Sequence, residues 1–494
     1  MTKSPPKNNR SNNRSSAAAK GPGRPGLGPN KPRPRPQAAP APRPNRASRG
    51  LELSDNPRLT AFRVLGEVAG GQTPEEALVS HGLLLSQRDA GLAAALVYEC
   101  VRHQTYLDWL MKSRLSAGKA APELAAILRL GLAQLLFFDR LGEHAVVSET
   151  VALAKAVLPG RHGLVNAVLR GLLRDREAGA PWPPQPPAGS DPVRNLAVRH
   201  SYPEWLTKRL MQDLGAEEAE SLMAAGNRPT PATLRLNPRR GSREELQKML
   251  PFSAEPTPLS PWGLTASEFS GRPENWPGFA EGLFAIQDEA SQLAGLLAGE
   301  LAPGAAVLDA CSGLGSKGLH LAALNPQATI TAADKDPAKL ERLRLEAARL
   351  GLDNIQTETR DLLAQPPASS AYDMVLVDAP CSGQGVIRRR PDLKWSKTAE
   401  DIGRLAELQQ RLLAAAAPAV KPGGRLIYGV CSFSREEGPE GAAKFLAAHP
   451  NFTMAAPSAW PENLREHLSA EGHLTLFPHR HHTDGFFWAI FDKM

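Results

Sequence analysis

Two cysteines, each placed just after an apolar segment, are the residues of this sequence best suited to covalent chemistry. Cys381 comes soon after the run Met374–Val377, and Cys431 directly follows the run Leu426–Val430. Both runs have the length and the composition of buried parallel strands. Ligands of open α/β sheets bind at the carboxyl ends of such strands, so we expect both thiols to take part in one reactive site.

Two thiols beside a carboxylate suit the methylation of carbon 5 of cytosine. That carbon is a poor nucleophile, but a thiolate that adds to carbon 6 turns the ring into an enamine, which can attack a sulfonium methyl group. The adduct must then lose the carbon 5 proton and expel the thiol. Asp378, at the end of the first apolar run, is placed to donate a proton to N3 of the ring.

Two other uses of these cysteines are less favoured. One buried cysteine at a strand end is more often a packing residue, but that explanation is poor for two cysteines at neighbouring strand ends. Zinc binding is not favoured either, and we predict no metal site, because the cysteines show no C-x-x-C spacing. They are Cys100, Cys311, Cys381 and Cys431.

A glycine-containing loop earlier in the chain fits a nucleoside cofactor. It follows a strand that ends at Asp309 and consists of Cys311, Ser312, Gly313, Leu314, Gly315, Ser316 and Lys317. Its glycines let the backbone approach a ligand, and the helix that it opens offers free N–H groups. The loop is not the phosphate-binding loop of ATPases, because Lys317 lacks the required spacing.

Acidic residues end the next two predicted strands, at Asp334 and Asp361. A carboxylate at the first position would accept hydrogen bonds from ribose hydroxyls, and the second could lie near an adenine. Either residue could instead cap a helix. The same architecture would also serve NAD, so the cofactor is inferred from the methylation chemistry, which requires the sulfonium of S-adenosylmethionine.

Alternating strands and helices from residue 283 onwards predict the doubly wound, Rossmann-like sheet that would position these residues. Strands are expected at 305–309, 329–333, 354–358, 373–377, 424–429 and 485–491. The clearest helices are expected at 337–350 and 402–419.

The segments before this sheet predict a multidomain chain of α and α/β type. Residues 55–176 have apolar side chains at helical spacing, for example Leu59, Phe62, Leu65 and Val68. Residues 177–192 form a Pro-rich linker, and 193–280 a small α+β subdomain. Residues 281–494 would be the catalytic domain.

Residues 1–50 differ from the rest of the chain in charge. They contain twelve Lys or Arg and no Asp or Glu, whereas the whole chain has a net charge of +7, so the remainder is net acidic. Many prolines and few apolar residues predict a disordered tail. It could be a phosphate-binding arm or a solubilising segment, and the sequence leaves both open.

The composition excludes several classes of protein. The chain has no apolar run of ~20 residues and so no predicted membrane span, and its basic N-terminus lacks the apolar core of a secretory signal. Four cysteines in 494 residues are no disulfide framework and favour a reducing cytoplasm. Nothing in the sequence demands more than a monomer.

The segment Asp378–Trp395 closely resembles the NOL1/NOP2/Sun family of RNA 5-methylcytosine methyltransferases. Further matches are Gln287–Ser291, Cys431–Ser432 with Glu436 and Glu437 after it, and His482–Phe487. In addition, Leu128–Gly131, His144–Val151 and Val165–Arg170 resemble the NusB-like helical RNA-binding domain. Residues from about 55 to 494 therefore look like the bacterial Sun/RsmB-type branch of the family, whose substrate is small-subunit ribosomal RNA.

This resemblance implies roles for individual residues. Cys431 would be the nucleophile, Cys381 would assist proton removal and release of the enzyme, and Asp378 would lie at both cytosine and S-adenosylmethionine. The loop Cys311–Lys317, with Asp334 and Asp361, would hold the cofactor. Two motifs depart from the family: its usual Cys-Ala-Ala-Pro-Gly-Gly-Lys loop reads Cys-Ser-Gly-Leu-Gly-Ser-Lys here, and its Thr-Cys-Ser reads Val-Cys-Ser.

Two further functions remain to be weighed. A non-catalytic RNA-binding ribosome-assembly factor on a methyltransferase fold is supported by the altered cofactor loop, and calorimetry with S-adenosylmethionine would distinguish it. An amino-group methyltransferase is a weaker alternative. Such enzymes usually present Asn/Asp-Pro-Pro-Tyr/Phe where this chain has Asp378-Ala379-Pro380-Cys381.

Overall fold

The computed structural model describes residues 56–82, 85–115, 120–186, 189–269 and 271–494. The basic tail that we predict at 1–50 lies outside these residues. Among the described residues, no helix combines the length and the apolar character that crossing a membrane requires.

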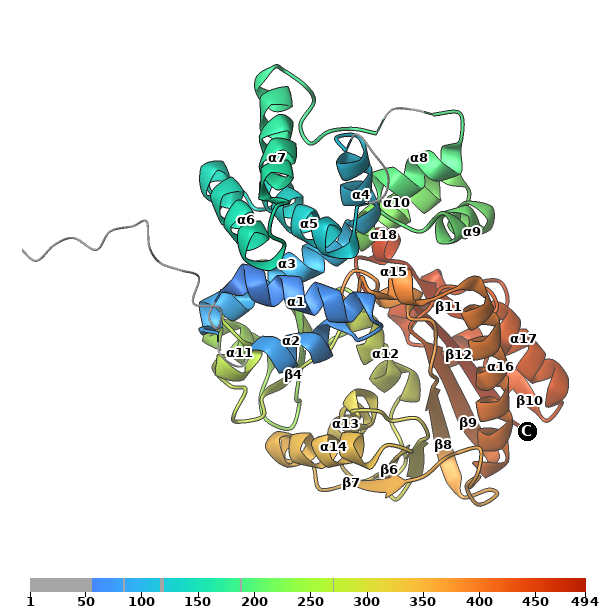
Figure 1. Ribbon diagram of the computed structural model, residues 1–494. Coiled ribbons are helices and arrows are strands. Elements are labelled where there is room, and N and C mark those ends of the chain that lie inside the picture. The colour runs from blue at the N-terminus through green and yellow to red at the C-terminus, as the bar shows by residue number, and fades with distance from the viewer. Residues whose placement is uncertain (1–55, 83–84, 116–119, 187–188, 270) are drawn as a thin grey trace, which may run out of the picture. The chain divides into compact units, whose positions relative to one another are not determined.

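A helical domain occupies the first part of the described chain (Figure 1). It contains α1 (Pro57–Ala69), α2 (Pro74–Gly82), α3 (Gln87–Arg102), α4 (Gln104–Lys112), α5 (Pro122–Phe137), α6 (Glu143–Val157) and α7 (His162–Glu177). The side chain of Asn56 begins α1 by accepting the amides of Arg58 and Leu59. Helix α5 is buried on nearly every side from Leu124 to Gln134, so it forms the centre around which its neighbours pack.

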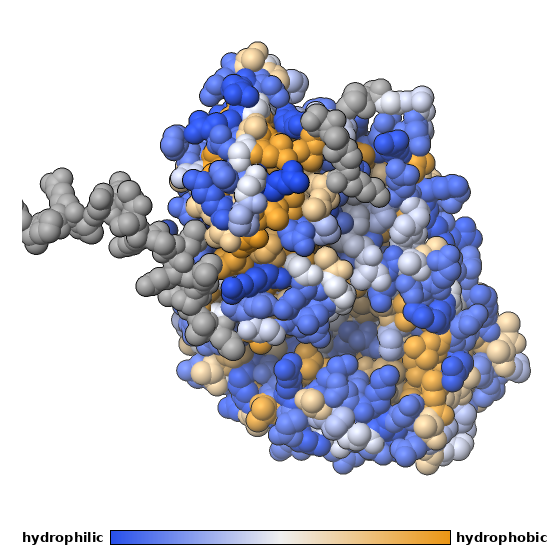
Figure 2. Space-filling view, in the orientation of Figure 1, coloured by the Kyte–Doolittle hydropathy of each residue, from blue (hydrophilic) through white to orange (hydrophobic). Residues whose placement is uncertain are grey.

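Hydrophilic residues cover most of the face shown in Figure 2, and apolar residues gather in patches among the helices of this domain. The buried apolar side chains of α1, α3, α4, α5 and α7 form one core cluster.

Three helices and a small sheet come next. The helices are α8 (Pro192–Arg199), α9 (Glu204–Leu214) and α10 (Ala216–Gly226). The sheet contains β1 (Ala232–Leu236), β2 (Glu255–Pro256), β3 (Gly263–Ala266) and β4 (Phe284–Ile286), in the order β2-β3-β1-β4, with α11 (Arg243–Met249) after β1. Because β1 pairs with β4, this sheet runs past residue 280, where we expected the subdomain to end.

The large sheet confirms the Rossmann-like fold class. Its strands are β5 (Ala306–Asp309), β6 (Thr329–Asp334), β7 (Ile355–Thr359), β8 (Tyr372–Asp378), β9 (Val420–Val430), β10 (Phe452–Met454), β11 (Leu474–Leu476) and β12 (Phe486–Lys493). They are ordered β10-β12-β9-β8-β5-β6-β7, and β11 pairs with β12. Strands β5 to β9 pair in parallel, whereas β12 is antiparallel to β9.

Helices cover both faces of this sheet (Figure 1). They are α12 (Glu289–Ala298), α13 (Ser316–Leu324), α14 (Pro337–Leu350), α16 (Ala399–Ala416) and α17 (Pro439–Ala448), with short α15 (Leu393–Ser396) and α18 (Pro478–His481) in loops. Figure 1 shows α13 and α14 on one side and α16 and α17 on the other.

The register of the parallel strands brings their carboxyl ends to one edge. Asp309 of β5 lies opposite Leu376 of β8, and Asp378 of β8 lies opposite Gly429 of β9. The loops that carry the predicted cofactor residues and the two cysteines predicted to be reactive therefore leave the sheet at neighbouring points.

Lys394 joins the catalytic domain to the helices that precede it. Its side chain is fully buried, and its ammonium donates to the carbonyls of Arg102 and Ser201, at 3.1 and 3.2 Å, and to Oδ1 of Asn227 at 2.6 Å. The neighbouring Trp395 donates to the carbonyl of Val101. One short segment thus ties the ends of α3, α8 and α10 to the loop that follows Cys381.

Replacing Lys394 with methionine should destabilise the protein, because it leaves three buried acceptors without this donor. We expect the free energy of unfolding to fall by about 3 kcal/mol, measured by urea unfolding followed through tryptophan fluorescence. Lys444→Met, at an exposed lysine on α17, is the matched control. Equal unfolding midpoints for the two variants would contradict the role given to Lys394.

Candidate functional site

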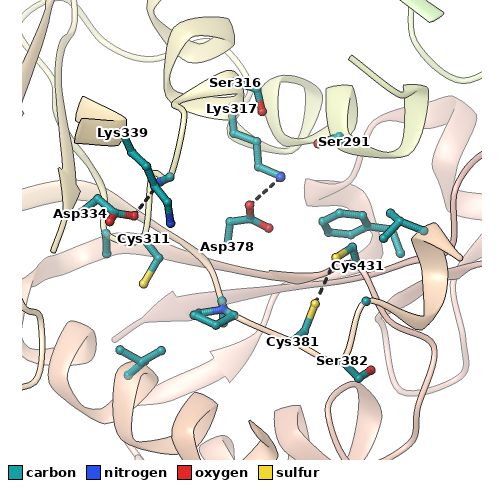
Figure 3. A pocket seen from close by; sticks show the side chains of 18 of the residues that line it. Ser291, Cys311, Ser316, Lys317, Asp334, Lys339, Asp378, Cys381, Ser382 and Cys431 are labelled. Carbon is teal, nitrogen blue, oxygen red and sulfur yellow. Dashed lines mark hydrogen bonds and ion pairs between the residues drawn. The ribbon is translucent and has the colours of Figure 1, made fainter. Parts of the chain in front are cut away.

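A cavity of about 810 Å³ opens at the carboxyl edge of the large sheet. Figure 3 shows that side chains from the cofactor loop and from both cysteine loops point into it. Of the predicted site residues, it is lined by Cys311, Gly313, Ser316, Lys317, Asp334, Asp361, Asp378, Cys381 and Cys431. Ser312, Leu314 and Gly315 do not line it.

The two glycines of the cofactor loop bend it into the helix that follows. Gly313 and Gly315 have φ angles of 56° and 81°, in the left-handed region that favours glycine. A Cβ atom on Gly315 would lie 2.2 Å from Cδ1 of Leu343. Gly315 also precedes the first residue of α13, and the first two residues of this helix, Ser316 and Lys317, line the cavity.

Asp334 holds the cofactor loop in place. Its Oδ2 accepts the Gly313 amide at 2.9 Å, and its Oδ1 accepts the Asp336 amide at 2.9 Å. The cap of α14 is Asp336, so Asp334 does not cap that helix. Asp361 accepts the amide of Leu363, two residues later, and closes its own turn.

The residues at this end of the cavity fit a nucleoside-containing cofactor. The carboxylates of Asp334 and Asp361 supply acceptors for hydroxyl and amino groups. Leu362, Leu363 and Pro380 line the same cavity and offer the apolar surface that a purine ring requires.

Lys317 and Asp378 form an ion pair between the cofactor loop and the thiols (Figure 3), with Nζ 2.6 Å from Oδ2. Burial alone would lower the pKa of Lys317, but the charge and the hydrogen bond of Asp378, together with charge on Cys431, raise it above its ordinary value. Lys317 is therefore a resident cation beside Cys431. Its ammonium also lies 5.1 Å from the ring centre of Phe486.

The two predicted reactive thiols meet. Sγ of Cys381 lies 3.1 Å from Sγ of Cys431, and both residues are half-buried. The hydrogen bond with Cys431, burial and the Glu437 charge all raise the pKa of the Cys381 thiol well above its ordinary value. Burial and neighbouring carboxylates raise the pKa of Cys311 to about 12, so this third cysteine stays protonated at neutral pH.

Gly385 brings three loops into contact, a role that the sequence did not reveal. Its amide donates to the carbonyl of Cys431 at 3.0 Å, and its carbonyl accepts the amide of Gly485 at 2.8 Å. A Cβ atom on Gly385 would lie 1.9 Å from the Gly485 carbonyl oxygen. Only glycine permits this approach of one backbone to another.

Two arginines that sequence reasoning left without a role pair with buried carboxylates at the rim of the cavity. Arg388 and Arg389 each bond to both Asp288 and Asp484. Asp288 also caps α12, so this cluster links the start of α12 to the loop after Cys381. Phe486 completes this part of the lining. These residues lay within the matched motifs, but their partners are remote in sequence.

Asp309, beneath the cofactor loop, should make stability depend on pH. Its side chain is 1% exposed, and burial, with the charge of Asp378 adding to it, raises the pKa of Asp309 from 3.8 to about 7. Between these values the folded protein holds a proton that the unfolded chain has lost. The free energy of unfolding therefore falls as the pH rises from about 4 to 7.

Asp309→Asn should remove this loss. Relative to the natural chain, the variant should gain up to about 4 kcal/mol between pH 4 and pH 7, measured by urea unfolding across that range. Asp353→Asn, at a side chain that is 94% exposed, should follow the natural chain. If the free energy of unfolding depends on pH in the same way for all three proteins, Asp309 is ionised in the folded state.

Family comparisons agree with this architecture. The model "16S rRNA methyltransferase RsmB/F" matches residues 297–492, the NusB family model matches 55–174, and a ferredoxin-like domain of RsmF/B-like methyltransferases matches 202–269.

The chain is also similar to whole curated proteins. A probable ribosomal RNA small subunit methyltransferase B of Synechocystis sp. is 34% identical over 451 residues, which are 88% of this chain and 99% of that protein. The ribosomal RNA small subunit methyltransferase B of Pseudomonas syringae pv. tomato is 39% identical over 402 residues, 79% of this chain and 87% of the relative.

Solved structures show the same fold. The crystal structure of PH0851 matches with a TM-score of 0.71 at 25% identity, over 88% of this chain and 99% of that one. A methyltransferase homolog protein from Pyrococcus horikoshii matches with a TM-score of 0.52 at 26% identity, over 62% of this chain and all of the other.

Proposed function

Because the chain belongs to the 16S rRNA methyltransferase RsmB/F family, we propose that it methylates carbon 5 of a cytosine in small-subunit ribosomal RNA through a covalent bond to Cys431. S-adenosylmethionine is the cofactor. The observation that carries the proposal is the 3.1 Å approach of Cys381 and Cys431 in a cavity that also contains the cofactor loop.

The cofactor supplies an electrophilic methyl group on a sulfonium. Asp334, Asp361 and the amides after Gly313 would hold its nucleoside part, as argued above from the lining of the cavity. The target base would then bind at the other end of the cavity, beside Asp378 and the two thiols. To enter, this base must first unstack from its neighbours in the RNA.

Cys431 attacks carbon 6 of the cytosine as a thiolate. The Lys317 ammonium lies close enough to interact with charge on this sulfur. As the S–C6 bond forms, electron density moves to N3 of the ring. The sequence suggested that Asp378 donates a proton there. Its carboxylate accepts a hydrogen bond from the Lys317 ammonium, so in our proposal the proton passes from Lys317 through Asp378 to N3.

Release reverses these steps after carbon 5 has taken the methyl group. The carbon 5 proton leaves, its C–H electron pair restores the C5–C6 double bond, and the C6–S bond breaks. Cys381 lies where it can hydrogen bond the departing sulfur. As the C6–S bond breaks, the Cys381 thiol gives its proton to that sulfur, and the Cys381 sulfur takes the carbon 5 proton in its place. The raised pKa of the Cys381 thiol favours its holding this proton.

Analysis of the product nucleoside tests this function. We would incubate the enzyme with radiolabelled S-adenosylmethionine and unmodified small-subunit rRNA, both free and in partial ribosomal particles, and digest the RNA for mass spectrometry. We expect label in 5-methylcytidine. Label in an N-methylated nucleoside would overturn the proposed chemistry. Absence of transfer to any of these RNAs and to transfer RNA would overturn the proposed function, and absence of S-adenosylmethionine binding in calorimetry would favour the assembly-factor alternative.

A further inference from the structure

A buried carboxylate lies behind the two thiols and has no part in the mechanism described so far. Glu437, in the loop between β9 and α17, has 0% of its surface exposed. Among the described residues, no lysine, arginine or histidine forms an ion pair with it. A buried charge without a counter-ion is costly unless hydrogen bonds replace its hydration.

Neutral donors surround this carboxylate instead. Oε1 accepts the Ser382 amide at 2.7 Å and Nε2 of Gln409 at 3.0 Å. Oε2 accepts the hydroxyls of Ser382 at 2.5 Å, Ser432 at 2.7 Å and Ser434 at 3.2 Å. Hydrogen bonds to an ionised acceptor are the stronger kind, so together they hold this group firmly.

Apart from Gln409 of α16, the donors belong to the segments that follow the two reactive cysteines. Ser382 comes directly after Cys381, and Ser432 directly after Cys431, and their hydroxyls are 3.2 Å apart. The Glu437 carboxylate therefore accepts hydrogen bonds from both cysteine loops, which leave different strands of the sheet. Because the two loops approach each other at this point, we expect these hydrogen bonds to help set the distance between the two sulfur atoms.

The charges around the thiol pair are also unequal. Lys317 lies on the side of Cys431, whereas the charge of Glu437 acts on Cys381 and contributes to the raised pKa of its thiol. A cation near one sulfur and an anion near the other both favour the arrangement in which the shared proton stays on Cys381.

We propose that Glu437 is a positioning residue that clamps the two cysteine loops together and, through its charge, keeps the proton of the thiol pair on Cys381. The inference rests on the proposed function, because it assigns the attack to Cys431. It adds a reason why the two thiols, only 3.1 Å apart, do not exchange roles.

The effect of the Glu437 charge on the two thiols can be tested without RNA, by comparing how fast each cysteine is alkylated. We would treat the protein at pH 8 with limiting iodoacetamide and locate the labelled cysteine by peptide mass spectrometry. In the natural chain, Cys431 should react about 10-fold faster than Cys381, since only thiolates react. Glu437→Gln should lose most of this preference. Glu436→Gln is the matched control, because Glu436 is the neighbouring carboxylate of the same loop and its side chain pairs with Arg209.

Oxidation with diamide tests whether Glu437 holds the two cysteine loops close together. Two thiols held at this distance should close to a disulfide rapidly, and Glu437→Gln should slow closure by about 100-fold, as expected for a displacement near 1 Å. Glu437→Asp keeps the charge but has a shorter reach, so it should retain the alkylation preference and still close slowly. Ser432→Ala removes one of the donors to Glu437 and should slow disulfide formation about 3-fold. If Glu437→Gln does not fold, this variant tests the positioning role instead.

Methyl transfer then separates this inference from the proposed function. In Glu437→Gln, kcat should fall about 100-fold with little change in the KM for RNA. A variant with natural selectivity, closure rate and kcat would overturn the role of Glu437 while leaving the function intact. If the natural chain makes no 5-methylcytidine, the proposed function fails, and the alkylation and closure rates still report whether Glu437 sets the thiol geometry.

Discussion

Cys381→Ala enzyme, incubated with small-subunit rRNA and S-adenosylmethionine, is expected to accumulate a protein–RNA adduct that survives denaturing electrophoresis. Cys431 can still attack carbon 6, but the sulfur that assists release is missing, so the covalent intermediate persists. Turnover should fall by on the order of 10³-fold or more. The measurement is a shifted band that contains both protein and labelled RNA.

Two variants make this result specific. Cys381→Ala/Cys431→Ala should form no adduct, because it lacks the attacking thiol. Cys100→Ala, at a buried cysteine of α3 in the helical domain, should turn over normally and leave no adduct. An adduct in Cys431→Ala but not in Cys381→Ala would mean that the two roles are reversed.

Asp378→Asn is expected to reduce methyl transfer by about 10²- to 10³-fold while S-adenosylmethionine still binds. Asparagine keeps the size of the side chain but cannot relay a proton between Lys317 and N3 of the base, and it leaves the ammonium of Lys317 without its partner. Single-turnover transfer and calorimetry with the cofactor measure the two effects separately.

Asp373→Asn is the control for this change. Asp373 is near the opposite end of the same strand and forms a similar ion pair, with Lys421 at 2.9 Å, far from the thiols along β8. It should transfer methyl groups at nearly the natural rate. Equal losses in the two variants would point to damage of the strand rather than to a role in proton transfer.

The fold could be predicted where the sequence carries long or regular signals. Helix α14 runs from Pro337 to Leu350, as expected, because proline and periodic leucines mark its start and its face. Strands β8 and β9 were expected from unbroken apolar runs. Strands β10 and β11 were missed, since each is only three residues long and too short for any periodicity to appear.

The reactive residues of the site could be predicted, but the hydrogen bonds that support them could not. The meeting of Cys381 and Cys431 followed from strand-end logic and from the family motifs. The hydrogen bonds of Glu437 could not be predicted, although this residue lay inside a matched motif. Its partners Ser382 and Gln409 are 55 and 28 residues away in the sequence. Hydrogen bonds across such separations depend on tertiary packing, which local sequence does not encode.

The segment around Lys394 and Trp395 has a consequence for how a target nucleotide is chosen. It bonds to α3 of the helical domain and lies in the same loop as Cys381, so the distance from that domain to the thiols is set by short hydrogen bonds. An RNA that rests on the helical domain would meet the reactive sulfur a fixed length away. If the proposed function holds, the target cytosine would be selected by its distance from the part of the folded RNA that the helical domain binds, more than by the neighbouring bases.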